Sequence, residues 1–312
     1  MQRLFLPLGF ILAFMLAGML PEWGRALSDA GMMPWLVVTV FLVNGYQVRL
    51  AEIPRAWGFL KVVLVSAAVS LLLGPWLGSL LAQELLLSAG ALIGLVVIGS
   101  VPPTLSSCIV LTQVAGGYAV WALVLSLVLN IVGVLSMPFM LAWLLNGYDT
   151  VGINPWLLLS QLGFIVLLPF LLGILLQRYM RPIRASWLLQ YLPSGCILIG
   201  VWMAMSDSVD IFNNIALLPL LQITLAVLLL HLLLFVANWW GGKLLCIERQ
   251  GRIAMTLTGS QKTLPVAMSV LALMDGPVGE ALLVCVLFHF LTLFIDTLIA
   301  PWMGKRPLAG GG

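Results

Sequence analysis

The chain has 312 residues and a net charge of +3; 62% of the residues are hydrophobic, only 8% are charged, and the mean hydropathy is +1.15. A soluble domain of this length cannot bury so much apolar surface, so the composition excludes soluble enzymes and nucleic-acid-binding proteins and indicates a polytopic membrane protein. The four cysteines lack CxxC or metal-ligand spacing, so we expect no disulfide framework.

Apolar segments of membrane length follow one another along the chain. They cover residues 4–20, 31–47, 59–82, 86–116, 119–146, 155–177, 186–206, 215–242, 250–274 and 279–303. Each is near or above the ~20 residues that a bilayer core requires, so we predict an all-α protein with ten transmembrane helices and short connections. The first segment has no small-residue cleavage site before Pro21, and we interpret it as a membrane helix rather than a signal peptide.

Basic residues gather on alternate connections between these segments. With the N-terminus inside, the outer loops hold a single basic residue, Arg25. The inner loops and tails hold Arg3, Arg49, Arg55, Lys61, Arg178, Arg181, Arg184, Lys243, Arg249, Arg252, Lys305 and Arg306. Because basic residues are enriched in cytoplasmic loops, the pattern predicts that both termini are cytoplasmic, in a bacterial inner membrane.

A short repeat divides the chain into two halves. The tetrapeptide LGFI occurs at 8–11 and again at 162–165, an offset of 154 residues, and each copy lies in the first of five predicted spans. The same offset carries Thr104 and Leu105 to the neighbourhood of Thr256 and Leu257. Since five is odd, the second set enters the membrane from the opposite side. We therefore predict two inverted five-helix repeats, residues 1–146 and 154–304.

The fourth and ninth spans are each interrupted near their middle by helix-breaking and polar residues. These are Pro102, Pro103, Thr104, Ser106 and Ser107 in the fourth span, and Thr258, Gly259, Ser260, Gln261, Lys262, Thr263 and Pro265 in the ninth. Unwound backbone at this depth is tolerated only where it is buried in protein or lines a wet cavity. Paired broken helices at matching positions mark transporter binding sites, whereas single prolines and hydroxyls also serve as kinks and packing points.

The breaks and their surroundings resemble the bile acid:sodium symporter family. The stretches that carry the likeness are PPTLSS and CIVLTQVAGG at 102–117, TGSQKTLP at 258–265 and LFHF at 287–290. They are most similar to the sodium-bile-acid-symporter-like branch with its Gly-Ser-(His/Gln)-Lys-Thr-Leu motif, and Asn44-Gly45 looks like the family's small-residue turn in the second span. The resemblance implies a panel domain of spans 1, 2, 6 and 7, and a core domain in which spans four and nine cross.

The likeness breaks down at the residues that bind sodium in known members. Their ninth-span glutamate is replaced by Leu257 and their fourth-span asparagine by Cys108, although Gln261 is kept. Hard cations usually need a carboxylate among several oxygens, so sodium coupling is in doubt. Ser126, Asn130 and Gln261 form a reduced sodium site in the alternative that keeps sodium.

Lys262 suggests a different solution at the same place. A lysine at a helix centre costs about 2.5–3.5 kcal/mol on insertion scales, so the charge must be compensated. We hypothesise that its ammonium binds the freed carbonyls of the fourth span and the hydroxyls of Thr104, Ser106 and Ser107, and so replaces sodium or couples transport to protons. The rival hypothesis keeps sodium and turns Lys262 toward an anionic substrate.

Two further ionisable residues lie seven positions apart in the last span, His289 and Asp296. That spacing places them on one helical face, where together they could relay protons, and the resemblance matches His289 to the family's tenth-span histidine. An interfacial role for Asp296 stays open, as does a role for His289 in helix packing, and we interpret His231 as structural. If His289 takes part in coupling, transport should change in the pH range where imidazole titrates.

The function that follows is secondary transport of a small organic anion by alternating access. The sequence lacks GxSxG, HExxH and phosphate-loop motifs, so an intramembrane enzyme is a weaker alternative, as is a channel. We expect no cofactor beyond sodium or a proton as coupling ion, and no partner beyond the substrate and the lipid bilayer. The substrate and the oligomeric state stay open, with a monomer as the simplest form.

Overall fold

The computed structural model describes residues 2–48, 57–105, 107–146, 154–179, 187–207, 209, 215–274 and 278–304, and this part of the chain is helical with short connections, as the sequence predicts. The helices are α1 Gln2–Met19, α2 Pro21–Asp29, α3 Met32–Tyr46, α4 Trp57–Ala67, α5 Gly74–Glu84, α6 Ala89–Ser100, α7 Ser107–Val114, α8 Ala119–Leu145, α9 Pro155–Leu162, α10 Leu168–Tyr179, α11 Trp187–Asp207, α13 Leu217–Leu244, α14 Arg249–Ser260, α15 Leu264–Leu271 and α16 Val278–Gly304. Two π-helical segments, η2 Ala68–Leu73 and η3 Gly163–Leu167, join α4 to α5 and α9 to α10.

Five helices of the described chain are long and apolar enough to cross a membrane, and six if the bent pair α1–α2 counts as one span. A bilayer favours helices because they satisfy their own backbone hydrogen bonds. The predicted fourth and ninth spans appear instead as pairs of short helices. With 12 and 8 residues, α6 and α7 are about 18 and 12 Å long, so neither half alone crosses a core of about 30 Å.

Residues 21–29 lie between two predicted spans but form a helix of their own. Helix α2 begins at Pro21, a residue suited to the first helical turn, and lies at 96° to α1. It packs against α11. The hydropathy pattern misses this helix because α2 has a polar face and is too short to span a membrane.

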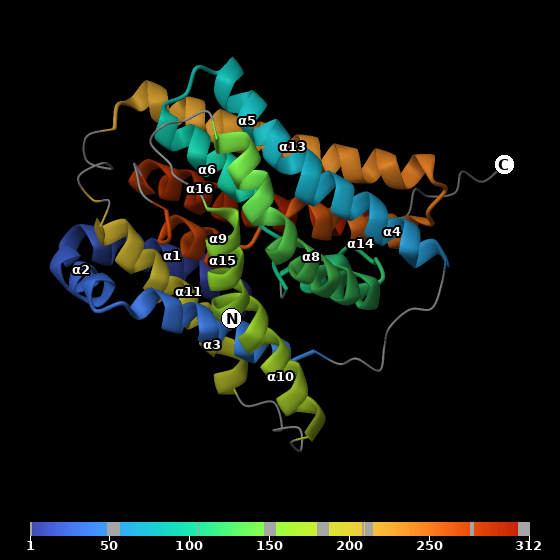
Figure 1. The fold of residues 1–312 in the computed structure, drawn as a ribbon. Coiled ribbons are helices and arrows are strands. Elements are labelled where there is room, and N and C mark those ends of the chain that lie inside the picture. Colours follow the sequence, from blue (N-terminus) through green and yellow to red (C-terminus); the bar gives the residue numbers. More distant parts are fainter. Residues whose placement is uncertain are drawn as a thin grey trace.

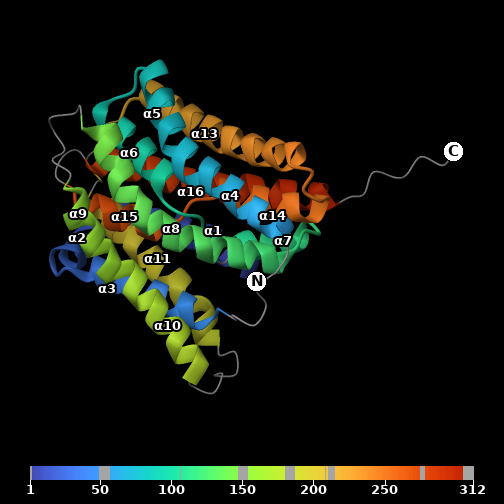
Figure 2. The same ribbon diagram turned by 45° about the vertical axis from the view of Figure 1, so that its right-hand side comes forward.

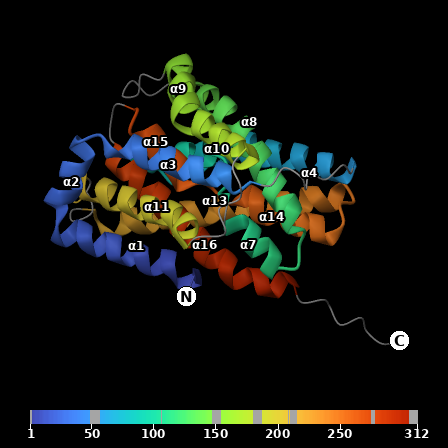
Figure 3. The same ribbon diagram turned by 90° about the horizontal axis from the view of Figure 1, so that it is seen from below.

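The helices form two groups (Figure 1). In one group, α1, α2 and α3 pack on α11, and α3 packs closely on α10. In the other, α5 and α16 flank α6, α13 packs on α14, and α4 runs beside α13 (Figure 2). The view from below shows α7 beside α14 and α16 (Figure 3).

Glycines allow α3 and α10 to approach backbone to backbone. A Cβ atom on Gly45 would lie 2.1 Å from the carbonyl oxygen of Phe170, and one on Gly173 would lie 2.2 Å from that of Leu42. Small residues at such crossings are typical of membrane helices, which associate through close packing. Gly45 therefore belongs to a helix–helix contact of the first group.

The second group contains two sets of helices with the same lengths. Helices α6 and α14 have 12 residues each, α7 and α15 have 8, and α8 and α16 have 27. The two non-glycine residues with positive φ in the described chain, Leu86 and Cys246, are 160 positions apart. Gly99-Ser100 ends α6 and Gly259-Ser260 ends α14 at the same offset. Helices α6 and α14 and the two positive-φ residues thus match at an offset of 160 residues, whereas the LGFI copies are 154 apart.

The turns before α6 and α14 make comparable contacts at the two ends of the molecule. Ser88 caps α6 and donates a hydrogen bond of 2.5 Å to Glu280 in the first turn of α16. Tyr118, which directly precedes α8, donates one of 3.0 Å to Glu248 at the start of α14. Each contact joins the start of a short helix to the start of a long one.

The contact with Glu248 raises the pKa of the exposed Tyr118 phenol, because the neutral phenol donates the hydrogen bond that a phenolate cannot. The contact therefore stabilises the fold below the ordinary tyrosine pKa of about 10, and this contribution is lost as the pH rises through the raised pKa. We expect Glu248→Gln to lower the pKa of Tyr118 in a titration of tyrosinate absorbance. Tyr118→Phe identifies the signal, and an unchanged titration in Glu248→Gln would contradict the contact.

Candidate functional site

The two helix breaks meet at one point inside the second group. Helix α6 ends at Ser100 and the chain is extended at Val101, before Pro102 and Pro103, which disfavour helix in the residues they follow. Helix α14 ends at Ser260, and the chain through Gln261 to Thr263 is not helical. The Thr263 N–H donates a 2.9 Å hydrogen bond to the Pro102 carbonyl, which ties one break to the other.

Two of the residues predicted at the ninth-span break have other roles. Pro265 lies in the first turn of α15 rather than in the break, because proline fits the start of a helix. Gly259 is still within α14, and a Cβ atom there would lie 2.5 Å from the Asn238 side-chain oxygen. Its lack of a side chain allows α14 to pack on α13.

The Lys262 side chain is fully buried and its ammonium is surrounded by oxygen atoms. Nζ donates to the carbonyls of Gly99 at 2.7 Å and Val101 at 3.1 Å, which the break frees from the helix. It also donates to the carbonyl of Ser70 at 2.5 Å and to its hydroxyl at 3.0 Å. The contact with the broken fourth span agrees with the hypothesis. The predicted contacts with Thr104 and Ser107 are wrong, because those hydroxyls bind Gln261.

Ser70 contacts Lys262 but is not among the site residues that the sequence predicts. It lies in η2, where π-helical hydrogen bonding displaces carbonyls from the regular α pattern, and such segments are frequent at functional sites. Gly74, at the start of α5, leaves room for the ammonium, since a Cβ there would lie 3.4 Å from Nζ. A serine inside an apolar span was the one signal available in the sequence.

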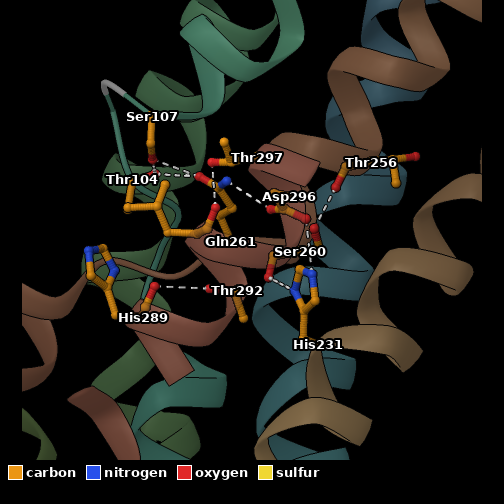
Figure 4. A network of polar contacts seen from close by, with 11 residues as sticks. Thr104, Ser107, His231, Thr256, Ser260, Gln261, His289, Thr292, Asp296 and Thr297 are labelled. Atoms are coloured by element: carbon orange, nitrogen blue, oxygen red, sulfur yellow. Dashed lines mark hydrogen bonds and ion pairs between the residues drawn. The ribbon is translucent and has the colours of Figure 1, made fainter. Parts of the chain in front are cut away.

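Gln261 is the centre of a second set of contacts (Figure 4). Its Oε1 accepts hydrogen bonds of 2.8 Å from both Thr104 and Ser107, at the far side of the fourth-span break. Its Nε2 donates a bond of 2.8 Å to the Asp296 carboxylate on α16. The Gln261 amide therefore joins α16 to the start of α7.

The other oxygen of Asp296 lies 3.0 Å from Nε2 of His231 on α13, and both residues are buried, with exposed fractions of 0% for Asp296 and 3% for His231. Asp296 therefore contacts His231 on a neighbouring helix, and within the described contacts His289 and Asp296 do not bond to each other. His289 turns its Nδ1 to the Lys262 carbonyl at 3.1 Å and packs edge-on against Phe10.

The helix crossing contains a carboxylate, that of Asp296, although Leu257 stands where known members of the family have a glutamate. Leu257 is fully buried in an apolar cluster with Leu111 and Ile253, as expected for a residue that binds no cation. The site nevertheless contains an acidic side chain, which comes from α16 and not from α14. The sequence shows Asp296 in the last span but does not show that its carboxylate lies beside Gln261.

Asn130 and Ser126 lie beside the fourth-span break on α8. Asn130 Nδ2 donates to the carbonyls of Pro103 at 3.0 Å and Ser126 at 2.7 Å, and the Ser126 hydroxyl donates to the Leu123 carbonyl. The buried Asn130 Oδ1 has no hydrogen-bond partner within the described residues.

The remaining predicted site residues are placed as follows. Ser260 donates to the carbonyl of Thr256 and directs its own carbonyl to His231 Nδ1 at 3.4 Å. Asn44 is half-buried on α3, in the first helix group, and is not among the hydrogen-bonding residues of the crossing described above. Ser106 lies outside the described residues.

The chain matches the model of the SBF-like CPA transporter family over residues 4–305, nearly its whole length. This confirms the resemblance to bile acid:sodium symporters on which the sequence analysis relied. The matched family consists of transporters and not of enzymes.

Named relatives are similar in sequence. A probable chloroplastic sodium/metabolite cotransporter BASS4 of Oryza sativa is 27% identical over 97% of this chain and 76% of its own length. An uncharacterized protein of Pseudomonas aeruginosa is 25% identical over 97% of this chain and 94% of its own length. Sodium/bile acid cotransporter 7 of Rattus norvegicus is 28% identical over 46% of this chain and 43% of its own length.

Proposed function

The chain belongs to the SBF-like CPA transporter family, and from this premise we propose that it is a secondary transporter that carries a small organic anion by alternating access. The proposal is supported by the relatives' names, which specify a metabolite or a bile acid as the solute. It is also supported by the buried positive charge of Lys262, next to the starts of α7 and α15, because helix N-termini favour anions.

For the architecture we propose ten membrane helices in two inverted repeats, residues 1–146 and 154–304. Equal helix lengths in α6–α8 and α14–α16, with Leu86 and Cys246 at an offset of 160 residues, support this division. In this arrangement α6–α7 and α14–α15 are the interrupted spans. The distribution of basic residues supports cytoplasmic termini in a bacterial inner membrane.

For the coupling ion we propose that Lys262 is a cation tethered to the protein at the place where a free cation would bind. The observation that carries this proposal is the set of four oxygens around its Nζ, at 2.5–3.1 Å, three of which are backbone carbonyls. Carbonyl and hydroxyl oxygens are the ligands that hard cations prefer. An ammonium held by them supplies one positive charge, so transport no longer requires sodium.

A second candidate function is sodium-coupled transport of the same class of solute. It is favoured by the buried Asn130 Oδ1, which has no hydrogen-bond partner within the described residues, and by relatives whose names include sodium. In this case a sodium ion binds near Asn130 while Lys262 stays with its carbonyls. The two candidates differ in whether the wild-type protein responds to sodium.

The test uses purified protein and a panel of anions: taurocholate, short carboxylates and alkyl sulfonates. We expect at least one anion to raise the unfolding temperature, and its uptake into proteoliposomes to proceed equally in sodium chloride and in choline chloride. Strict dependence on sodium would refute the tethered cation and favour the second candidate. If no anion of the panel binds or is taken up, the assignment of an organic anion as substrate fails.

A further inference from the structure

The buried pair of His231 and Asp296 has no role in the function proposed above. The two side chains belong to different helices, α13 and α16, and their nearest atoms are 3.0 Å apart. We propose that this pair is a proton-binding site whose occupancy is transmitted to the helix crossing, and that its proton is the coupling ion of the transporter. The coupling role rests on the proposed function, whereas the proton-binding site does not depend on it.

The His231–Asp296 pair has two hydrogen positions, one on His231 Nδ1 and one between His231 Nε2 and the Asp296 carboxylate. His231 Nδ1 faces the Ser260 carbonyl at 3.4 Å, so a hydrogen on Nδ1 has an acceptor. The second proton lies between Nε2 and Oδ1, either on the imidazole or on the carboxyl, and both arrangements are neutral as a pair. Loss of that proton leaves a net charge of −1 in a place that water does not reach. The pair can therefore bind one proton, and it can release this proton when the transport cycle opens the pair to water.

The network provides a path from the pair to the crossing. Asp296 accepts a hydrogen bond from Gln261, and Gln261 in turn accepts from Thr104 and Ser107 (Figure 4). A carboxylate accepts a stronger hydrogen bond than a neutral carboxyl group does. A change of protonation at Asp296 thus changes the strength of its hydrogen bond with Gln261. Because Gln261 also bonds to Thr104 and Ser107, the change reaches the start of α7.

Other ionisable groups on the elements packed against α13 and α16 have partners of their own. Lys262 is held by Ser70, Gly99 and Val101, and His289 faces a carbonyl of the backbone. Further described contacts are those of Arg249 with the Met303 carbonyl, Arg252 with the Trp239 ring, Lys243 with the Trp240 ring, Glu248 with Tyr118, Glu280 with Ser88, Asp207 with Ser28, Cys108 with the Thr104 carbonyl and Cys285 with the Gly94 carbonyl. Lys61 and Glu84 are exposed on α4 and α5.

The proton site can be tested without any substrate. The chain has two histidines, so His289→Gln leaves His231 as the only one. We expect nitrogen-15 NMR of histidine-labelled protein to show one protonation step of the His231–Asp296 pair when the pH is varied over the range in which the protein stays folded. Asp296→Asn should remove the spectroscopic signature of the imidazole–carboxylate hydrogen bond. A His231 spectrum that is constant over this pH range would overturn the proposal.

A second experiment tests coupling. Proteoliposomes are loaded with a bound anion from the panel above, and uptake driven by a pH gradient is compared with counterflow at equal pH. We expect Asp296→Asn to lower gradient-driven accumulation at least tenfold more than it lowers counterflow. The control is Thr224→Val: Thr224 is half-buried on α13, and its hydroxyl donates to the Leu220 carbonyl of the same helix.

The outcomes separate the two proposals. If wild-type accumulation ignores the pH gradient while His231 titrates, the coupling role fails and the proton site stands. Equal losses of accumulation and counterflow in Asp296→Asn, in protein that is folded, would also refute the coupling role. If no anion is transported at all, the proposed function fails and the NMR titration alone decides the proton site.

Discussion

Replacement of Lys262 by alanine is expected to make the protein bind sodium. The substitution removes the ammonium but keeps the carbonyls of Ser70, Gly99 and Val101, which then have no donor. Buried acceptors without a partner destabilise the folded protein by about 1–3 kcal/mol each. A small cation that binds these carbonyls therefore restores part of the lost stability. Sodium chloride should therefore raise the unfolding temperature of Lys262→Ala, and choline chloride should not.

The size of the effect follows from mass action. A ligand at 100 times its dissociation constant stabilises a protein by about 2.7 kcal/mol. In uptake assays with sodium absent, Lys262→Ala should lose transport by at least about tenfold, equivalent to about 1.4 kcal/mol, and added sodium should restore part of it. Measurements of unfolding temperature and of uptake in matched salts check both statements.

Two variants serve as controls for this experiment. Lys262→Met loses the charge but fills the space, so sodium should have no effect on its stability. Lys61→Ala removes an exposed lysine from α4 and should behave like the wild type in both salts. A sodium effect of equal size in the wild type and in Lys262→Ala would contradict the tethered cation, because it would show that the ion binds elsewhere.

The sequence predicts the crossing of the breaks better than it predicts the partners of each residue. Pro102 and Pro103 exclude regular helix for local reasons, and Lys262 requires acceptors wherever it is buried, so a contact with freed carbonyls could be predicted. Ser70 could not, because a π-helical segment leaves no pattern in the sequence and Ser70 is 192 positions away from Lys262. Non-local pairing of this kind depends on helix packing.

The pairing of Asp296 shows the same limit. Helical periodicity correctly places His289 and Asp296 on one side of α16, but the atoms that meet belong to a neighbouring helix. Hydropathy does not tell which helix faces which, so His231 looked like an isolated histidine in an apolar stretch. The same limit applies to α2, whose position against α11 depends on contacts and not on apolar length.

Replacement of Gln261 by leucine is expected to uncouple the two breaks. The amide of Gln261 donates a hydrogen bond to Asp296 and accepts hydrogen bonds from Thr104 and Ser107. Leucine has nearly the same volume but neither a donor nor an acceptor. Loss of the donor leaves a buried carboxylate oxygen unpartnered, at about 1–3 kcal/mol or more. We expect uptake to fall at least about tenfold, which corresponds to about 1.4 kcal/mol, together with a lower unfolding temperature.

The matched control is Gln222→Leu, the same substitution at a half-buried glutamine on α13 that makes a longer bond of 3.5 Å to the Leu85 carbonyl. Gln261→Glu gives the opposite test of the mechanism, because it keeps the acceptor for Thr104 and Ser107 but places a second carboxyl group 2.8 Å from Asp296. Two carboxylates at this distance cannot both be ionised, so one must hold a proton or a cation. Uptake by Gln261→Glu should therefore depend more steeply on pH than uptake by the wild type. A Gln261→Leu protein that transports as well as Gln222→Leu would show that the contact between Asp296 and the crossing has no part in transport.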